Sequence, residues 1–174
     1  MATMPSINID QAKSQLKSLR DHGFADKLAA LAGTHGFPAT YFFAIASRET
    51  NCQNILGDFQ GGQYHGVGII QIDIQHDVAR QARDSGSYKT NPGPLLSFGA
   101  DLIKANIHTV AQHFPNLTSD QHLKIAASAY NCGPVNAIKG AEHGDSDSHT
   151  TGHDYGHDVM VRKGFFDQLI AAGH

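Results

Sequence analysis

Hydrophobic residues recur at helical spacing through most of the chain. In residues 10–22, Ala12, Leu16 and Leu19 share one stripe, and Asp10 stands where it can cap a helix. The same spacing predicts helices over residues 25–32, 38–50, 94–114, 118–129 and 159–170, and a short one opened by Pro134. The helix over residues 38–50 is apolar almost all round, which is typical of a buried central helix.

Three segments interrupt the helical pattern. Residues 57–75 are glycine-rich and then β-branched, which predicts a loop and a small hairpin or sheet. Residues 84–94 and 143–156 are polar and predict loops. With 174 residues, we expect one helix-rich domain of mainly α (α+β) class covering residues 1–174, with one small β element.

Composition and charge exclude several classes of protein. Hydrophobic residues make up 40% of the chain and charged residues 17%, as in globular domains. The net charge of −3 argues against a basic nucleic-acid-binding face and against docking on anionic membranes. No apolar run approaches the ~20 residues of a transmembrane helix, so we expect no membrane insertion.

The N-terminal residues lack the apolar core of a secretory signal peptide. Three explanations stay open at this point. The chain stays in the cytosol, its signal has been removed, or it is exported by another route.

Three acidic residues are candidates for catalysis. Glu49 ends the apolar helix, where partial burial raises a carboxyl pKa and suits it to general acid work. Asp58 and Asp73 flank the glycine-rich segment, and a glycosidase needs an acid and a second carboxylate on opposite sides of the scissile bond. The alternatives are an ion pair of Glu49 with Arg48 on a surface turn, and turn or capping roles for the aspartates.

The run A-Y-N-C-G at residues 129–133 places two further polar side chains at a helix-to-loop turn. Tyr130 and Asn131 can hydrogen-bond a sugar there. The alternative is that Asn131 caps the helix and Tyr130 belongs to the core.

Four motifs in order resemble the goose-type lysozymes, which are related to the soluble lytic transglycosylases. They are S-R-E-T at 47–50, G-V-G-I-I-Q-I-D at 66–73, A-Y-N-C-G at 129–133 and H-D-Y-x-x-D-V at 153–159. The similarity covers about residues 20–170. The resemblance implies a lysozyme-like fold with the small sheet beside a cleft.

The resemblance also implies roles. Glu49 matches the catalytic acid, Asp73 one of two aspartates that hold the attacking water, and Asp58 the other, although its loop differs in length from the family pattern. Positions that line the sugar cleft are matched by Gln71, Tyr130, Asn131 and Tyr155, and His76 stands one position from the family's histidine. No cofactor and no metal are implied.

The implied reaction is that of a muramidase. It cleaves the β-1,4 bond between N-acetylmuramic acid and N-acetylglucosamine in peptidoglycan glycan strands with inversion, for which the carboxyls stand about 6.5–9.5 Å apart. The alternatives are a lytic transglycosylase that forms 1,6-anhydro products and a non-catalytic peptidoglycan-binding domain. An antibacterial effector delivered by type VI secretion, with an immunity protein that occupies the cleft, is a further hypothesis.

Two groups of residues leave alternatives open. Cys52 and Cys132 lie on elements that meet at the cleft if the lysozyme-like fold holds, either as a disulfide or as two buried thiols. The histidine-rich loop forms either a metal site or a solvated rim of the cleft. Its histidines are His143, His149, His153 and His157.

Overall fold

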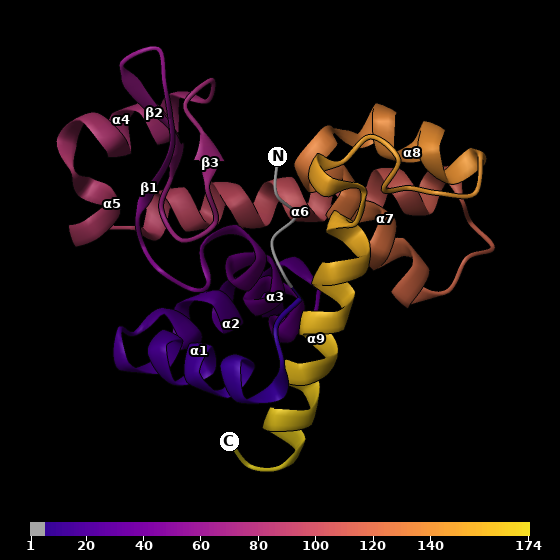
Figure 1. Cartoon of the computed structure of the whole chain (residues 1–174), viewed down its shortest axis with the longest axis horizontal. Helices are drawn as coiled ribbons and strands as arrows, with labels where there is room; N and C mark the ends of the chain where they lie inside the picture. Colours follow the sequence, from indigo (N-terminus) through magenta and orange to yellow (C-terminus); the bar gives the residue numbers. More distant parts are fainter. Residues whose placement is uncertain (1–5) are drawn as a thin grey trace.

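The computed structural model describes residues 6–174, and within that range it contains nine α-helices, a short 3₁₀ helix and one three-stranded antiparallel sheet (Figure 1). The helices are α1 (Ile9–Asp21), α2 (Phe24–His35), α3 (Ala39–Thr50), α4 (Asp77–Ser85), α5 (Ser87–Thr90), α6 (Gly93–His113), α7 (Ser119–Cys132), α8 (Pro134–Glu142) and α9 (Tyr155–Ala171). The strands are β1 (Leu56–Gln60), β2 (Gln63–Val67) and β3 (Ile72–Asp73), and the 3₁₀ helix is η1 (Thr151–His153).

The helices expected from hydrophobic spacing are confirmed, with differences at their ends. Asn8, not Asp10, caps α1, because its side chain accepts from the Gln11 N–H while the Gln11 side chain accepts from the Asn8 N–H. α2 continues through Gly33 and ends at Gly36, which has a left-handed backbone (φ 81°). α7 has the expected start, since Thr118 forms a capping box with Gln121.

The prediction of a loop over residues 84–94 is partly wrong. α5 lies inside that segment and α4 runs up to it. α4 buries only two alanines, Ala79 and Ala82, so its core-facing stripe is too weakly hydrophobic to stand out in the sequence.

α3 runs through the centre of the molecule. Residues 41–48 are all buried, as the apolar pattern predicts, and the helix packs against α2 and α9. It ends at Asn51, whose left-handed backbone lets its N–H bond back to carbonyls of the last turn. The last turn therefore carries Glu49 out of the core at a fixed position.

The three strands form one antiparallel sheet in the order β1-β2-β3. β1 and β2 pair from Leu56↔Val67 to Gln60↔Gln63, and β2 pairs with β3 through Gly66↔Asp73. Gly61 and Gly62 connect the hairpin with φ of 57° and 82°, as in the type I′ turns that match strand twist.

Two hydrophobic clusters hold these elements in place. The larger one joins α1–α3, the sheet, α6 and α9, and a smaller one fills the space between α6, α7 and α8. The sheet with α4 and α5 therefore stands at one end of the long helix α6, and α7 and α8 stand at the other (Figure 1). Within residues 6–174, no helix combines the length and apolarity that a membrane span requires.

The structure also decides between the alternatives left open for the cysteines. Cys52 is buried and Cys132 is partly buried, and both are free thiols. The disulfide is therefore absent, and burial raises the pKa of the Cys52 thiol to about 12.

Candidate active site

A cavity of about 240 Å³ lies between the end of α3, the sheet and the end of α7. It contains every site residue expected from the sequence except Tyr155. Its lining residues are Glu49, Asp58, His65, Gly66, Gln71, Ile72, Asp73, Gln75, His76, Leu102, Tyr130 and Asn131.

A larger pocket of about 410 Å³ lies along α1. Its described lining residues are serine, glutamine, asparagine and isoleucine, none of which titrates near neutral pH. This pocket therefore offers no side chain for acid–base chemistry near neutral pH.

Glu49 is a carboxyl group of the cavity whose pKa its surroundings change. Glu49 as a whole residue is partly exposed. Its carboxyl group, however, contacts the buried side chain of Tyr155. Burial raises the pKa of Glu49 from 4.5 to about 7, against the hydrogen bond from Tyr155 and the charge of Arg48, which lower it, while the charge of Asp58 raises it. Near neutral pH, a substantial fraction of the Glu49 side chains therefore carries a proton to donate, whereas ordinary glutamates are almost fully ionised.

Tyr155 joins the site through Glu49. It is the first residue of α9, it is buried, and its hydroxyl donates a hydrogen bond to Glu49 Oε1. Burial and the nearby charge of Glu49 hold the pKa of Tyr155 well above 10.0, so the hydroxyl stays a donor. Its ring centre lies 5.4 Å from the guanidinium carbon of Arg48, in cation–π geometry.

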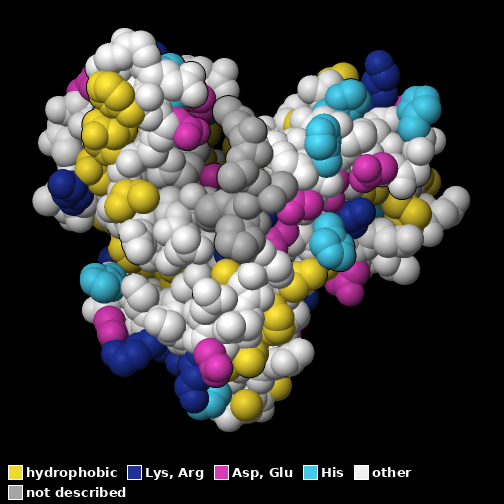
Figure 2. Space-filling model, viewed as in Figure 1, with side chains coloured by type: hydrophobic (Ala, Val, Ile, Leu, Met, Phe, Trp, Pro, Cys, Tyr) yellow, Lys and Arg dark blue, Asp and Glu magenta, His cyan; other side chains and the backbone are white. Residues whose placement is uncertain are grey.

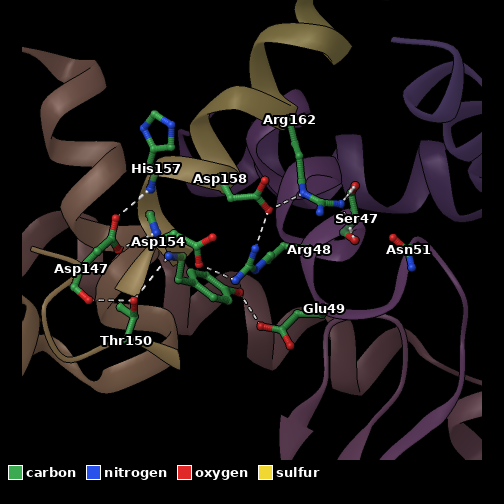
Figure 3. A network of polar contacts seen from close by, with 12 residues as sticks. Ser47, Arg48, Glu49, Asn51, Asp147, Thr150, Asp154, His157, Asp158 and Arg162 are labelled. Atoms are coloured by element: carbon green, nitrogen blue, oxygen red, sulfur yellow. Dashed lines mark hydrogen bonds and ion pairs between the residues drawn. The ribbon is translucent and has the colours of Figure 1, made fainter. Parts of the chain in front are cut away.

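Arg48 does not pair with Glu49 on a surface turn, which was the alternative interpretation of this sequence. It is buried and turns toward α9, where Nη1 donates to Asp158 Oδ2 (2.8 Å) and Nη2 donates to Asp154 Oδ1 (2.8 Å), as Figure 3 shows. Asp158 Oδ2 also accepts from Nε of the fully buried Arg162 at 2.6 Å. Two buried arginines therefore share one buried carboxylate.

The same network ties α9 to α3. Nη1 of Arg162 donates to the carbonyl oxygen of Ser47 at 3.0 Å and lies 2.8 Å from its hydroxyl oxygen (Figure 3). Because Ser47 and Arg48 directly precede Glu49, these contacts fix the end of α3 relative to Tyr155. The sequence motifs contain these residues, but nothing in their spacing shows which charges pair.

Asp147 was not expected from the sequence to have a role. It is buried, and its carboxylate accepts the N–H groups of Gly156 (2.7 Å) and His157 (2.9 Å) in the first turn of α9 (Figure 3). A Cβ at Gly156 would lie 2.4 Å from the Ser128 hydroxyl oxygen, so glycine lets α9 approach α7 closely. Both features hold the start of α9, and with it Tyr155, in position.

The sheet brings two carboxylates to the opposite side of the cavity. Asp73 pairs with Gly66, which pairs in turn with Gly57, the neighbour of Asp58. Both aspartates are exposed; Asp73 Oδ1 accepts from the Gln75 N–H at 2.7 Å, and Asp58 has a positive φ of 52° that is uncommon for a residue with a side chain. These carboxylates stand in solvent, where they can hold water.

Gln71 lines the cavity, but most of its amide group is engaged inside the protein. Its Nε2 donates to the carbonyl oxygens of Ile55 (3.1 Å) and Gly68 (2.8 Å). A Cβ at Gly57 or Gly66 would lie 2.0 or 2.1 Å from Gln71 Oε1, so these two glycines make room for the side chain. Gln71 therefore braces the sheet, with its amide oxygen packed against the two glycines.

The remaining expected residues of the cavity, Tyr130, Asn131 and His76, are each held by a contact within the protein. The Tyr130 hydroxyl donates to the carbonyl oxygen of Ile70 at 2.7 Å, and Asn131 Oδ1 accepts from the Thr151 N–H at 2.8 Å, which orients the amide of Asn131. The His76 ring centre lies 4.8 Å from that of Phe98.

His65 is a lining residue that the sequence analysis missed. It lies on β2 directly before Gly66 and is partly buried. Its place one residue before the G-V-G-I-I-Q-I-D motif is the signal that could have revealed it.

The histidine-rich loop does not present a metal centre. Among residues 6–174, no three His, Cys, Asp or Glu side chains gather in a way that could hold a metal ion. Nδ1 of His153 lies 2.8 Å from the carbonyl oxygen of Ser148, so this ring is engaged within its own loop.

Comparison with known proteins identifies the family. A sequence profile described as lysozyme g matches residues 11–169. The lysozyme g of Epinephelus coioides is 29% identical over 166 residues, covering 90% of this chain and 80% of that protein. Those of Struthio camelus and Casuarius casuarius are each 32% identical over 124 residues, covering 71% of this chain and 56% and 62% of those proteins.

The aligned part of the chain thus spans little more than half of the length of the Struthio camelus relative. The profile, however, extends over nearly the whole of this chain and includes all four ordered motifs. The chain therefore belongs to the goose-type lysozyme (lysozyme g) family.

Proposed function

We propose that this protein is a muramidase that hydrolyses the β-1,4 bond between N-acetylmuramic acid and N-acetylglucosamine in peptidoglycan, with inversion. The observation that supports it is one cavity that holds a carboxyl with a raised pKa, Glu49, and two exposed carboxylates, Asp58 and Asp73, on its sheet side. Inverting glycosidases need this division between an acid and a base.

In the proposed reaction, Glu49 protonates the glycosidic oxygen. Asp73 and Asp58 orient a water molecule and accept its proton as it attacks the sugar from the opposite face. The hydrogen bond from Tyr155 and the charge of Arg48 both favour the ionised form of Glu49. They therefore stabilise the carboxylate that forms as the proton leaves.

Sugar binding is assigned to the remaining residues of the cavity. Asn131 and Tyr130 lie at the end of α7, and Gln71 and His76 lie on the sheet side. Tyr155 acts through Glu49.

Hydrolysis is favoured over lytic transglycosylation by the sheet side of the cavity. A transglycosylase lets the 6-hydroxyl of the muramyl residue attack and has no need of carboxylates that hold water. Both Asp58 and Asp73 are exposed and line the cavity here.

Digestion of purified peptidoglycan followed by mass spectrometry of the soluble fragments tests this function. Fragments with reducing ends are expected from the native protein, and Glu49→Gln should lose about 10²–10⁴-fold in rate, the usual contribution of general acid catalysis. Glu142→Gln is the matched control, because Glu142 is the only other glutamate in the chain and it lies half-exposed beside His113.

Two other results would contradict the proposal. Fragments lighter by one water have 1,6-anhydro ends and would identify a lytic transglycosylase. No fragments from either protein would favour a peptidoglycan-binding domain without catalysis.

Finer parts of the sequence interpretation stay predictions. These are action outside the cell or in the periplasm, delivery by a specialised system such as type VI secretion, and control by an immunity protein that occupies the cleft. A small inhibitor encoded beside the gene should bind this protein in competition with glycan fragments. If glycan fragments do not weaken the binding of the inhibitor, the inhibitor does not bind in the cleft.

A further inference from the structure

The tip of the β1–β2 hairpin carries a pair of exposed aromatic rings that the proposed reaction does not use. Phe59 and Tyr64 are partners across the two strands, and 61% and 41% of their surfaces are exposed. Their ring centres lie 4.9 Å apart in an edge-to-face arrangement. Figure 2 shows hydrophobic side chains gathered over this hairpin. Contiguous exposed apolar surface of this kind commonly marks a binding site.

The rings are held in place before any ligand binds. The turn through Gly61 and Gly62 closes the hairpin directly beside them. From α4, Nη1 of Arg83 donates to Gln63 Oε1 at 3.0 Å and to the carbonyl oxygen of Tyr64 at 3.1 Å. A binding surface that is already ordered loses little entropy when it takes a ligand.

The hairpin tip is continuous with the catalytic cavity. Tyr64 lies two residues before Gly66 on β2, so the two residues face the same side of the sheet, and Gly66 lines the cavity beside Gln71. Two residues of a strand span only about 7 Å. A glycan strand that leaves the cavity past the sheet therefore comes within reach of the two rings.

The chemistry of the tip matches a sugar. A pyranose ring has a face of C–H groups that packs on an aromatic ring, and the acetyl methyl of an N-acetylhexosamine adds apolar surface. The exposed Gln60 and Gln63 pair beside the rings and carry amide groups that can hydrogen-bond sugar hydroxyls. Two rings flanked by polar side chains are too small an apolar surface for a stable protein interface.

We propose that Phe59 and Tyr64 form a sugar-binding platform that extends the active-site cleft and takes N-acetylhexosamine rings away from the scissile bond. This inference rests on the proposed function, since the same glycan strand occupies both parts. It makes the hairpin a determinant of substrate length: long glycan strands reach the platform, whereas short oligosaccharides that fill the cavity do not.

The test compares substrates of two lengths with the double variant Phe59→Ala/Tyr64→Ala. The KM for long glycan strands should rise about tenfold with little change in kcat, as truncation of well-packed aromatic contacts commonly costs. The KM for a short oligosaccharide should stay unchanged. Ile170→Ala is the matched control, because Ile170 is 44% exposed on α9.

The conservative variants Phe59→Tyr and Tyr64→Phe keep both rings and should retain the KM of the native protein for long strands. An unchanged KM for long strands in the double variant would overturn the proposal. Equal losses on long and short substrates would also overturn it, because they would mean that the variant disturbs Asp58 rather than a separate platform.

A binding measurement separates this proposal from the proposed function. Co-sedimentation with insoluble peptidoglycan, in the Glu49→Gln background, needs no turnover. The double variant should bind about tenfold more weakly than Glu49→Gln alone. Even if the native protein cut no peptidoglycan, weaker binding would support the platform, and unchanged binding would overturn it.

Discussion

The two sides of the cavity hold their carboxyls in opposite ways. On the helical side, Glu49 lies among buried groups at the end of α3, bonded to the buried Tyr155. On the sheet side, Asp58 and Asp73 are exposed. Burial makes the charged form of a carboxyl costly and keeps it protonated, whereas solvent lets it ionise. In the proposed reaction, this contrast lets the same chemical group serve as the acid on one side and as the base on the other.

The two sides are also built differently. The helical side depends on long-range ion pairs, in which Arg48 and Arg162 share Asp158. The sheet side depends on backbone geometry, since glycines at 57 and 66 leave room for the Gln71 side chain. Changes to charge should therefore damage the first side most.

The largest expected effect comes from Asp158→Asn, which removes the carboxylate that two buried arginines share. We expect the free energy of unfolding to fall by about 3–5 kcal/mol, the usual cost of breaking a buried ion pair. Urea denaturation measures it. In the exposed pair of Lys17 and Asp21, Asp21→Asn should cost less than about 1 kcal/mol, and similar losses in both variants would refute the contrast.

An intermediate effect is expected for the stability of Glu49→Gln. Because the pKa of Glu49 is about 7 in the folded protein and near 4.5 otherwise, the folded state binds more protons between these values, so stability falls as pH rises through that window. Glutamine does not titrate. The variant should therefore be more stable than the native protein by up to about 3 kcal/mol above pH 7.

Thermal or urea denaturation at pH 8 and at pH 4 measures this difference. Below the pKa of the unfolded state, Glu49 is protonated in both the folded and the unfolded protein. The extra stability of Glu49→Gln should therefore vanish at pH 4. A gain of the same size at both pH values would show that burial of the charge is not its cause.

The smallest effect is expected for Tyr155→Phe, which removes the hydrogen bond to Glu49 but keeps the ring. That bond lowers the pKa of Glu49, so its loss should raise the pKa and move the alkaline limb of kcat/KM upward by about one pH unit. A pH–rate profile measures the shift. Tyr130→Phe is the control, since the Tyr130 hydroxyl donates to Ile70 instead; a downward shift for Tyr155→Phe would contradict the account.

The sequence predicts the helical side of the fold well. The apolar run before Glu49 predicts a buried helix, and the structure confirms one over Ala39–Thr50. The four ordered motifs also lead to residues that the fold gathers around one cavity. Hydrophobic spacing and the order of motifs are sufficient to predict these features, because both can be seen directly in the linear sequence.

Features that depend on distant contacts could not be predicted. Arg48 has an adjacent carboxylate in sequence, yet it pairs with Asp154 and Asp158, which only the packing of α9 on α3 brings close. The sequence pattern did not predict α4, because the buried residues of this helix are alanines, which give only a weak hydrophobic signal. Asp147 caps α9 from a polar loop whose sequence shows nothing of that role.

The pKa of Glu49 tests the central claim most directly. The chain has only two glutamates, Glu49 and Glu142, so ¹³C labelling of glutamate side chains yields two carboxyl signals, and Glu142→Gln assigns them. Titration followed by NMR should show Glu49 ionising at a pKa of about 7. A Glu49 carboxyl that titrates near the ordinary value of 4.5 would contradict the claim that burial makes it the acid.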